Sequence, residues 1–194
     1  TFSGPNHVTN ILGRVTGGTS SQLDGAIRST IPNADLYLIN PAGLMFGPNA
    51  TLDVPGSFHA STAATLRFQD GNQFNARTPA ASVLTVAPIQ SFGFLSNTPS
   101  PITVEGNTNL TASPGKTFSL LGGDLKINQS VVTASGGRIN LASVASPGEV
   151  TPLPADLTLS ATQQPGNINI QESIVTVSGG GSNAGIYIRG GQFT

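Results

Sequence analysis

The nine acidic residues of this 194-residue chain are the side chains that could do hydrolytic or metal-dependent chemistry. Glycoside hydrolysis requires two carboxylates that flank one bond, and a Ca²⁺ site requires several oxygen ligands around one point. No two acids are adjacent and no Asp-x-Asp occurs; Asp35 and Asp53, 18 residues apart, could meet only through folding. His7 and His59 belong to no metal-spaced motif and suit surface or corner positions, and the chain has no cysteine. We therefore expect no catalytic residue, no metal site and no cofactor.

Three glycine clusters are the other pattern to consider, because glycine-rich loops can cradle phosphates. They are Gly17-Gly18, Gly122-Gly123 and Gly179-Gly180-Gly181. None is followed by a helix pattern or a Walker lysine, and GGxGxD calcium repeats are missing. The clusters therefore predict corners between strands.

Composition restricts both the fold class and the partners. The chain has 24 Gly and 14 Pro, and only 9% of its residues are charged, which disfavours long amphipathic helices and favours strands joined by many turns. A net charge of −1 without Lys or Arg clusters excludes a nucleic-acid footprint. No apolar stretch approaches the roughly 20 residues that span a bilayer, so direct membrane insertion is not expected. The length suits one all-β domain over residues 1–194, expected to be a monomer.

A repeat with an offset of 43 residues occupies the C-terminal half of the chain. Residues 123–137 read GDLKINQSVVTASGG, and residues 166–180 read GNINIQESIVTVSGG. A finer step of seven residues separates four apolar positions, each opening an apolar-x-apolar pair: Phe118, Leu125, Val132 and Ile139. This spacing predicts strands of about three to five residues between Gly, Asn and Ser corners, with three strands to a turn of roughly 20 residues.

This periodicity predicts an all-β fold, a right-handed parallel β-helix with short extra strands in loop excursions. Short strands cannot bury an apolar face alone, whereas stacked turns can, at about 4.8 Å per turn. The chain supplies at most roughly nine turns, and fewer once loops are subtracted. A β-sandwich is the alternative, but the 43-residue repeat and the seven-residue step have no natural place in it.

Two proline-rich segments, near residues 77–101 and 145–166, are expected to leave the helix as excursions, because proline interrupts the hydrogen bonding of central strands. Within the first, Ser82–Val86 and Ile89–Leu95 are apolar enough to form extra strands packed on the helix. Asparagines stacked inside turns would help to determine the fold, and the candidates are Asn40, Asn128 and Asn169.

Two strong turn signals stand between strand steps in residues 33–62. They are Asn40-Pro41-Ala42-Gly43 and Gly47-Pro48-Asn49, in which proline fixes φ and a later Gly or Asn accepts a positive φ. From their spacing alone, both turns are predicted to be corners of the β-helix.

Asn40-Pro41-Ala42-Gly43-Leu44 also resembles the Asn-Pro-Asn-Gly-Ile motif of two-partner secretion (TPS) domains, the N-terminal domains of filamentous haemagglutinin-like exoproteins. Ala42 replaces the usual second Asn, and the Asn-Pro-Asn-Leu motif of other members has Thr19–Leu23 as its nearest equivalent. The resemblance covers nearly the whole chain and is nearest to the cyanobacterial branch. Other family patterns are matched in order by Asn10–Gly17, Leu23–Gly25, Phe46–Ala50, Gly56–Phe58, Leu121–Asp124 and Ser135–Ile139.

The resemblance implies the N-terminal secretion domain of a large, adhesin-like exported protein. A partner outer-membrane β-barrel of the TpsB type would recognise the domain in the periplasm through its POTRA domains. The domain would then nucleate β-helix folding outside the cell, in a protein that is secreted or held at the cell surface. The residues expected to act in recognition or as a fold signature are Asn40, Pro41, Gly43 and Leu44, with Asn10, Arg14 and Gly25 as further candidates.

Both ends of the chain bear on this expectation. Family domains begin some tens of residues earlier, so an N-terminal truncation is expected. The strand step at Ile186–Arg189 is followed by no cap, which suggests that a C-terminal β-helix of the same exoprotein continues the fold. The alternative function is a carbohydrate-binding or carbohydrate-active β-helix, against which the aromatic content of 6% and the absence of Trp argue.

Overall fold

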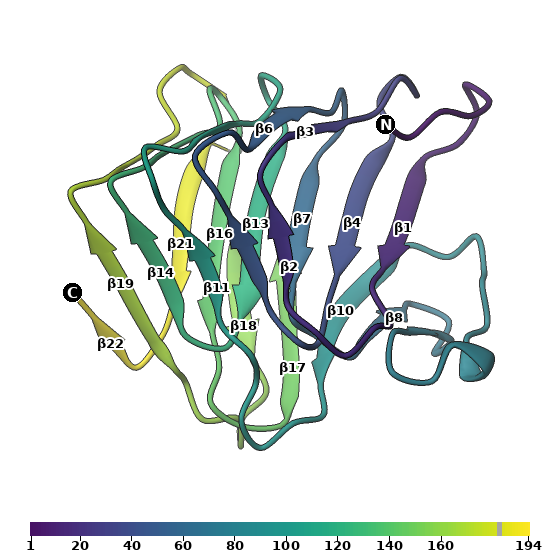
Figure 1. The fold of residues 1–194 in the computed structure, drawn as a ribbon. Coiled ribbons are helices and arrows are strands. Elements are labelled where there is room, and N and C mark those ends of the chain that lie inside the picture. The colour runs from purple at the N-terminus through teal and green to yellow at the C-terminus, as the bar shows by residue number, and fades with distance from the viewer. Residues whose placement is uncertain (182–183) are drawn as a thin grey trace.

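The computed structural model describes residues 1–181 and 184–194, which form a parallel β-helix (Figure 1). Each coil of the chain adds one strand to each of up to three faces, and the N- and C-terminal ends lie at opposite ends of the stack (Figure 1). The first face is a six-stranded parallel sheet made of β1 (Asn10–Arg14), β4 (Asp35–Ile39), β7 (Phe58–Ser61), β13 (Thr117–Gly122), β16 (Arg138–Ser143) and β21 (Gly185–Arg189).

The other two faces are also parallel. The second face contains β2 (Ser21–Leu23), β5 (Leu44–Phe46), β11 (Ile102–Val104), β14 (Leu125–Asn128), β19 (Asn167–Gln171) and β22 (Gln192–Phe193). The third face consists of two smaller sheets, one with β3 (Ala26–Arg28) and β6 (Thr51–Asp53), the other with β12 (Asn109–Thr111), β15 (Val131–Thr133) and β20 (Ile174–Thr176).

The strand register confirms both predicted periods. The four residues of the seven-residue step lie in the consecutive strands β13, β14, β15 and β16, and all four are buried. Phe118 pairs with Ile139, 21 residues later, which is one coil without an excursion. Leu125 pairs with Ile168 and Val132 with Val175, so the 43-residue repeat is one coil plus the second excursion. Like side chains therefore stack on one another inside the helix.

A fifth, antiparallel sheet covers the outer side of the first face, and we call it the covering sheet. Both excursions contribute to it, in the order β18 (Asp156–Leu159), β17 (Gly148–Leu153), β10 (Ile89–Phe94), β8 (Thr65–Phe68) and β9 (Gln73–Asn75). A second apolar core, separate from the core inside the helix, packs between the two sheets and includes Leu66, Phe92, Leu121 and Val150. The first face is therefore covered on both sides, and its central strands β7, β13 and β16 are buried along almost their whole length.

The first excursion differs from the expectation in two respects. It leaves the helix after β7, so β8 and β9 belong to it, rather than beginning near residue 77. Ile89–Leu95 does contain a strand, but Ser82–Val86 does not: it follows a 3₁₀ helix (Pro79–Ala81) and leaves Val83, Leu84 and Val86 exposed. The places next to β10 in the covering sheet are taken by β8 and β17. The apolar character of a segment does not show whether a neighbouring strand is available for it to pair with.

The expected stacking of Asn128 and Asn169 is also wrong. In the β14–β19 ladder, Asn128 lies opposite Gln171 and Asn169 lies opposite Lys126, so the two asparagines do not meet. The corners that follow β14 and β19 are not formed by stacked asparagines. Gln129 and Glu172 occupy them in successive coils, each in a left-handed conformation with φ of 48°. The Gln129 amide donates to the Glu172 carboxylate over 2.9 Å, which ties the two corners together.

Candidate functional site

The turn Asn40–Gly43 joins β4 to β5 and touches the coils on both sides of it. The Gly43 N–H donates to the Asn40 carbonyl over 3.0 Å, which closes a four-residue turn. Gly43 has a φ of +119°, a conformation that other residues rarely adopt. On one side the Gly43 carbonyl accepts the Ser21 N–H at 3.1 Å, and on the other the Pro41 carbonyl accepts the Ser100 hydroxyl at 2.8 Å. The motif is therefore a corner that fastens three coils.

The Asn40 side chain is the buried centre of this corner, with 1% of its surface exposed. Its Nδ2 donates to the Thr19 carbonyl over 3.0 Å and to the Ser21 hydroxyl over 2.9 Å, both in the preceding coil. Its Oδ1 accepts the Ala42 N–H at 3.0 Å. Ala42 contributes only its backbone to this bond, so the change from the family's usual Asn leaves the corner intact.

Two other candidate residues lie beside this corner. Leu44 follows it directly and is buried in the core inside the helix. Arg14 ends β1 next to Ile39, and its guanidinium donates to the Asn75 carbonyl over 2.9 Å and the Ser82 hydroxyl over 2.8 Å. The same guanidinium lies 4.7 Å from the centre of the Phe74 ring. Arg14 therefore fastens the first excursion to the first coil.

The remaining two candidates, Asn10 and Gly25, are not part of this group. Asn10 is exposed at the opposite end of β1, where its Nδ2 donates to the Thr9 hydroxyl over 3.3 Å. Gly25 is exposed at the next corner, after β2. The structure thus brings together Asn40, Pro41, Gly43, Leu44 and Arg14, and leaves two of the seven candidates apart.

The acidic residues have structural contacts. Asp24 accepts the backbone and side-chain N–H groups of Asn49 at 2.8 and 3.1 Å, and Asp124 accepts the Asn167 N–H at 2.9 Å. Asp35 accepts the Ser57 N–H at 2.7 Å, whereas Asp53 pairs with Arg28 at 2.9 Å, so the two carboxylates are held by different partners. These carboxylates cap turns and link neighbouring coils.

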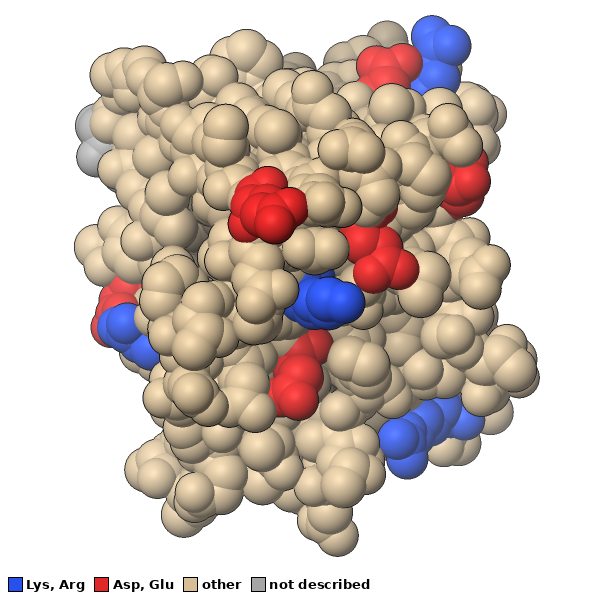
Figure 2. Space-filling model, turned by 60° about the vertical axis from the view of Figure 1, so that its left-hand side comes forward, with Lys and Arg blue, Asp and Glu red and all other residues tan. Residues whose placement is uncertain are grey.

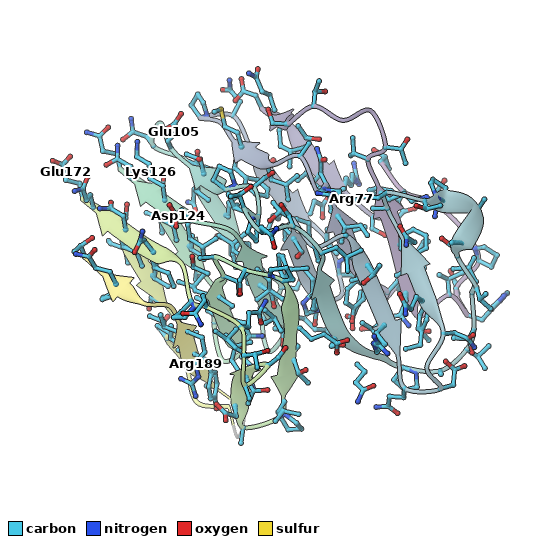
Figure 3. All side chains as sticks on the ribbon, turned by 90° about the horizontal axis from the view of Figure 1, so that it is seen from below. Arg77, Glu105, Asp124, Lys126, Glu172 and Arg189 are labelled. Carbon is cyan, nitrogen blue, oxygen red and sulfur yellow. The ribbon has the colours of Figure 1, made fainter. Side chains whose placement is uncertain are left out.

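Charge is sparse on the surface. Figure 2 shows acidic and basic side chains standing singly or in small groups among uncharged residues. Figure 3 shows Glu105, Asp124, Lys126 and Glu172 on the same side of the helix, with Arg77 and Arg189 far from them. Lys126 and Glu105 form an ion pair of 3.8 Å. Within residues 1–181 and 184–194, no three His, Cys, Asp or Glu side chains group so as to hold a metal ion. The same part of the chain contains no helix long and apolar enough to cross a membrane.

His59 is a residue whose position the sequence did not reveal. Instead of a surface or corner position, it lies in β7 on the outer side of the first face and is 8% exposed. Its ring stacks on that of Tyr37 with centroids 4.4 Å apart, and its Nδ1 lies 2.9 Å from the Ser119 hydroxyl. Burial lowers the pKa of His59 to about 3, and burial followed by the nearby Asp35 raises the pKa of Tyr37. Both rings are therefore uncharged at neutral pH.

Acidification is expected to destabilise the domain through His59. The folded state holds this imidazole neutral, whereas the unfolded chain binds a proton below the ordinary pKa of 6.5. This contribution to the free energy of unfolding should be fully present above about pH 6.5 and fall by roughly 1 kcal/mol per pH unit towards pH 3. Urea unfolding across this range measures the slope. His59→Gln should flatten it and His7→Gln, at an exposed position, should not; equal slopes in both variants would disprove the assignment.

Comparison with known protein families agrees with this geometry. The family model of the TPS secretion domain matches residues 1–189, which include the Asn40–Gly43 corner and both excursions. No curated protein matches the sequence. The family consists of secretion domains of exoproteins that work with TpsB-type transporters, and it is not an enzyme family. With a match over nearly its whole length, the chain belongs to the TPS secretion domain family.

Proposed function

We propose that this chain is the N-terminal secretion domain of a large, adhesin-like exoprotein of the filamentous haemagglutinin type. In this proposal the POTRA domains of a TpsB-type outer-membrane transporter recognise it in the periplasm, and it nucleates the folding of the β-helix outside the cell. The mature protein is then secreted or held at the cell surface, with this domain as a single monomeric unit. The family match supports the secretion role, and the order of the sequence motifs favours the cyanobacterial branch.

The burial of the motif is the observation that carries this proposal. Asn40 and Leu44 are 1% and 2% exposed, and the donors and acceptor of the Asn40 amide are already bonded within the fold. A partner that reads these side chains must therefore meet them before the domain folds. Asn10 and Gly25 are exposed and would be readable in either state.

An extended chain offers a simple mode of recognition. Each strand of the β-helix is short and apolar on alternate residues, and an unfolded strand of this kind can add to the edge of a sheet in a POTRA domain. Low charge and the absence of cysteine favour passage of an extended chain through a barrel. After recognition, the same motif would have a structural role. Arg14, Pro41 and Gly43 would hold the first coils together once the corner has folded.

The last coil supports the proposal that further coils follow in the same exoprotein. Ile174, Ile186 and Phe193 are large apolar side chains that remain exposed at this end of the helix. A following coil would cover them and pair with the open edges of β21 and β22, which otherwise present unpaired backbone groups. The folded domain would thus serve as the template for the next coil.

Export of the chain tests the proposal. Residues 1–194 behind a cleavable signal peptide should reach the medium only when the partner transporter is present. Asn40→Ala with Pro41→Ala should reduce the exported amount about tenfold or more, with the chain retained in the periplasm. The matched control is Gln69→Ala at an exposed position of the first excursion, which should be exported normally. Export without the transporter, or normal export of the double variant, would contradict the proposal.

A further inference from the structure

A cleft of about 320 Å³ lies between the outer side of the first face and the covering sheet. Tyr37, His59 and Asn140 line it from β4, β7 and β16, and Phe92 lines it from β10. The volume falls at the lower end of the roughly 300–1,000 Å³ that is typical of small-molecule sites. Nothing in the secretion role requires this cleft.

The cleft is open because the pairing of β10 with β17 stops early. The paired residues end at Phe92 and Val150, and Pro152 has no N–H with which to continue the ladder. Pro152 and Pro154 line the cleft with apolar groups, and Phe92 also borders it but is 1% exposed. The proline at position 152 thus ends the ladder beside the cleft.

The floor of the cleft is an ordered polar network. The Asn140 Nδ2 donates to the Ser119 hydroxyl over 3.1 Å, and Arg138 Nε donates to the Asn140 Oδ1 over 2.6 Å, which fixes the orientation of the amide. The Ser119 hydroxyl can then donate its hydrogen to His59 Nδ1, 2.9 Å away. With the hydroxyl hydrogen assigned in this way, the neutral imidazole carries its proton on Nε2.

Two polar groups of the lining residues are left over. In the described part of the chain, neither His59 Nε2 nor the Tyr37 hydroxyl has a hydrogen-bond partner, although both residues are largely enclosed and line the cleft. Both groups are therefore free to bond to a molecule in the cleft. A ligand with hydroxyl groups would satisfy both.

The charge of Arg138 is already engaged. Besides Asn140, its guanidinium donates to the Pro154 carbonyl over 2.6 Å and to the Asp156 carbonyl, and it stacks 3.7 Å from the centre of the Tyr187 ring. The other described residues that line the cleft are uncharged, since His59 is neutral. The cleft therefore offers neutral hydrogen-bonding groups beside apolar ring faces.

We propose that this cleft binds one neutral sugar ring, either a free monosaccharide or the terminal unit of a glycan. A pyranose presents hydroxyl groups around its rim and C–H groups on its faces. Its hydroxyls would bond to His59 Nε2 and the Tyr37 hydroxyl, and a C–H face would pack against Pro152 and Pro154.

Titration of the folded domain with D-glucose, D-galactose and lactose, followed by NMR of the His59 imidazole, tests this inference. At least one probe should give a saturable shift with a Kd in roughly the millimolar range. Tyr37→Phe should weaken it about fivefold, the loss of one hydrogen bond, without changing the melting temperature, because that hydroxyl has no protein partner in the described chain. Tyr187→Phe is the matched control and should bind normally, since Tyr187 does not line the cleft.

The results distinguish a free monosaccharide from the end of a glycan as the ligand, and they can also disprove the proposed site. Tighter binding of lactose than of D-galactose assigns the cleft to a glycan end, and the reverse assigns it to a free monosaccharide. Absence of a saturable shift up to roughly 100 mM, far above the expected Kd, would overturn the inference. So would equal binding by the Tyr37→Phe and parent proteins, or a shift produced only by D-glucuronate and D-galacturonate.

Discussion

A Gly123→Ala variant is expected to lose about 3–5 kcal/mol of stability or fail to fold, because it forces two coils of the β-helix apart. Gly123 lies in the corner between β13 and β14, where its N–H donates to the Ser100 carbonyl over 2.9 Å. A Cβ at this position would lie 2.1 Å from the Pro99 carbonyl oxygen. The atoms that this Cβ would meet belong to the backbone of Pro99 and Ser100, so no side-chain rotation relieves the clash. Urea unfolding monitored by circular dichroism measures the effect.

Gly17→Ala is the matched control for this prediction. Gly17 also belongs to a predicted corner cluster, but a Cβ added there would meet no atom within 4 Å, and its φ is not in the left-handed region. Its stability should change by less than about 0.5 kcal/mol. Similar unfolding midpoints for the two variants would show that close contact between coils at Gly123 does not limit stability.

An Asn40→Ala variant is expected to lose about 2–4 kcal/mol of stability. The change removes two donated bonds to the preceding coil and one accepted bond within the turn, all in a buried site. The Thr19 carbonyl and the Ala42 N–H are then left without these partners, and such desolvated groups cost more than the bond itself gains. The measurement is the free energy of unfolding from urea titration.

Asn10→Ala serves as the control for Asn40. Asn10 is exposed and its amide donates only to the neighbouring Thr9, so the expected loss is below about 0.5 kcal/mol. A value for Asn40→Ala as small as that for Asn10→Ala would mean that the corner is held by its backbone bonds alone. The motif residue would then have no structural reason to be an asparagine.

The coils of the β-helix could be predicted because every stacked strand must place an apolar side chain in the core. Phe118, Leu125, Val132 and Ile139 each point into one core, so the chain shows an apolar residue at each strand in turn. The turns around Pro41 and Pro48 were equally visible, since proline and the residues after it restrict the backbone. Local rules and the global fold agree at these positions.

The covering sheet could not be predicted in the same way, because its contacts join distant segments. The composition of β8 (Thr65–Phe68) is like that of the strands in the β-helix. This strand nevertheless pairs with β9 and β10 outside the β-helix. The left-handed corners at Gln129 and Glu172 carry no turn signal, because these residues ordinarily avoid a positive φ and adopt it here within the stacked coils.

Part of the candidate site was also beyond reach of the sequence. The motif at Asn40–Leu44 was found from its turn residues and its resemblance to a family, but the partners of Asn40 in the preceding coil were not. Arg14 contacts Asn75 and Ser82, 61 and 68 residues away, and no local pattern encodes such a contact. The network of His59, Ser119 and Asn140 likewise depends on the stacking order of β7, β13 and β16.

The most direct test of the central claim is the binding of folded and unfolded chains to the isolated POTRA domains of the partner transporter. The parent protein supplies the folded form, and the parent in mild denaturant or the Gly123→Ala variant supplies the unfolded form. We expect binding mainly by the unfolded forms, weakened when Asn40 and Pro41 are replaced. Equal binding by the folded parent, or undiminished binding by the unfolded Asn40 and Pro41 variants, would contradict a secretion address that is read before folding.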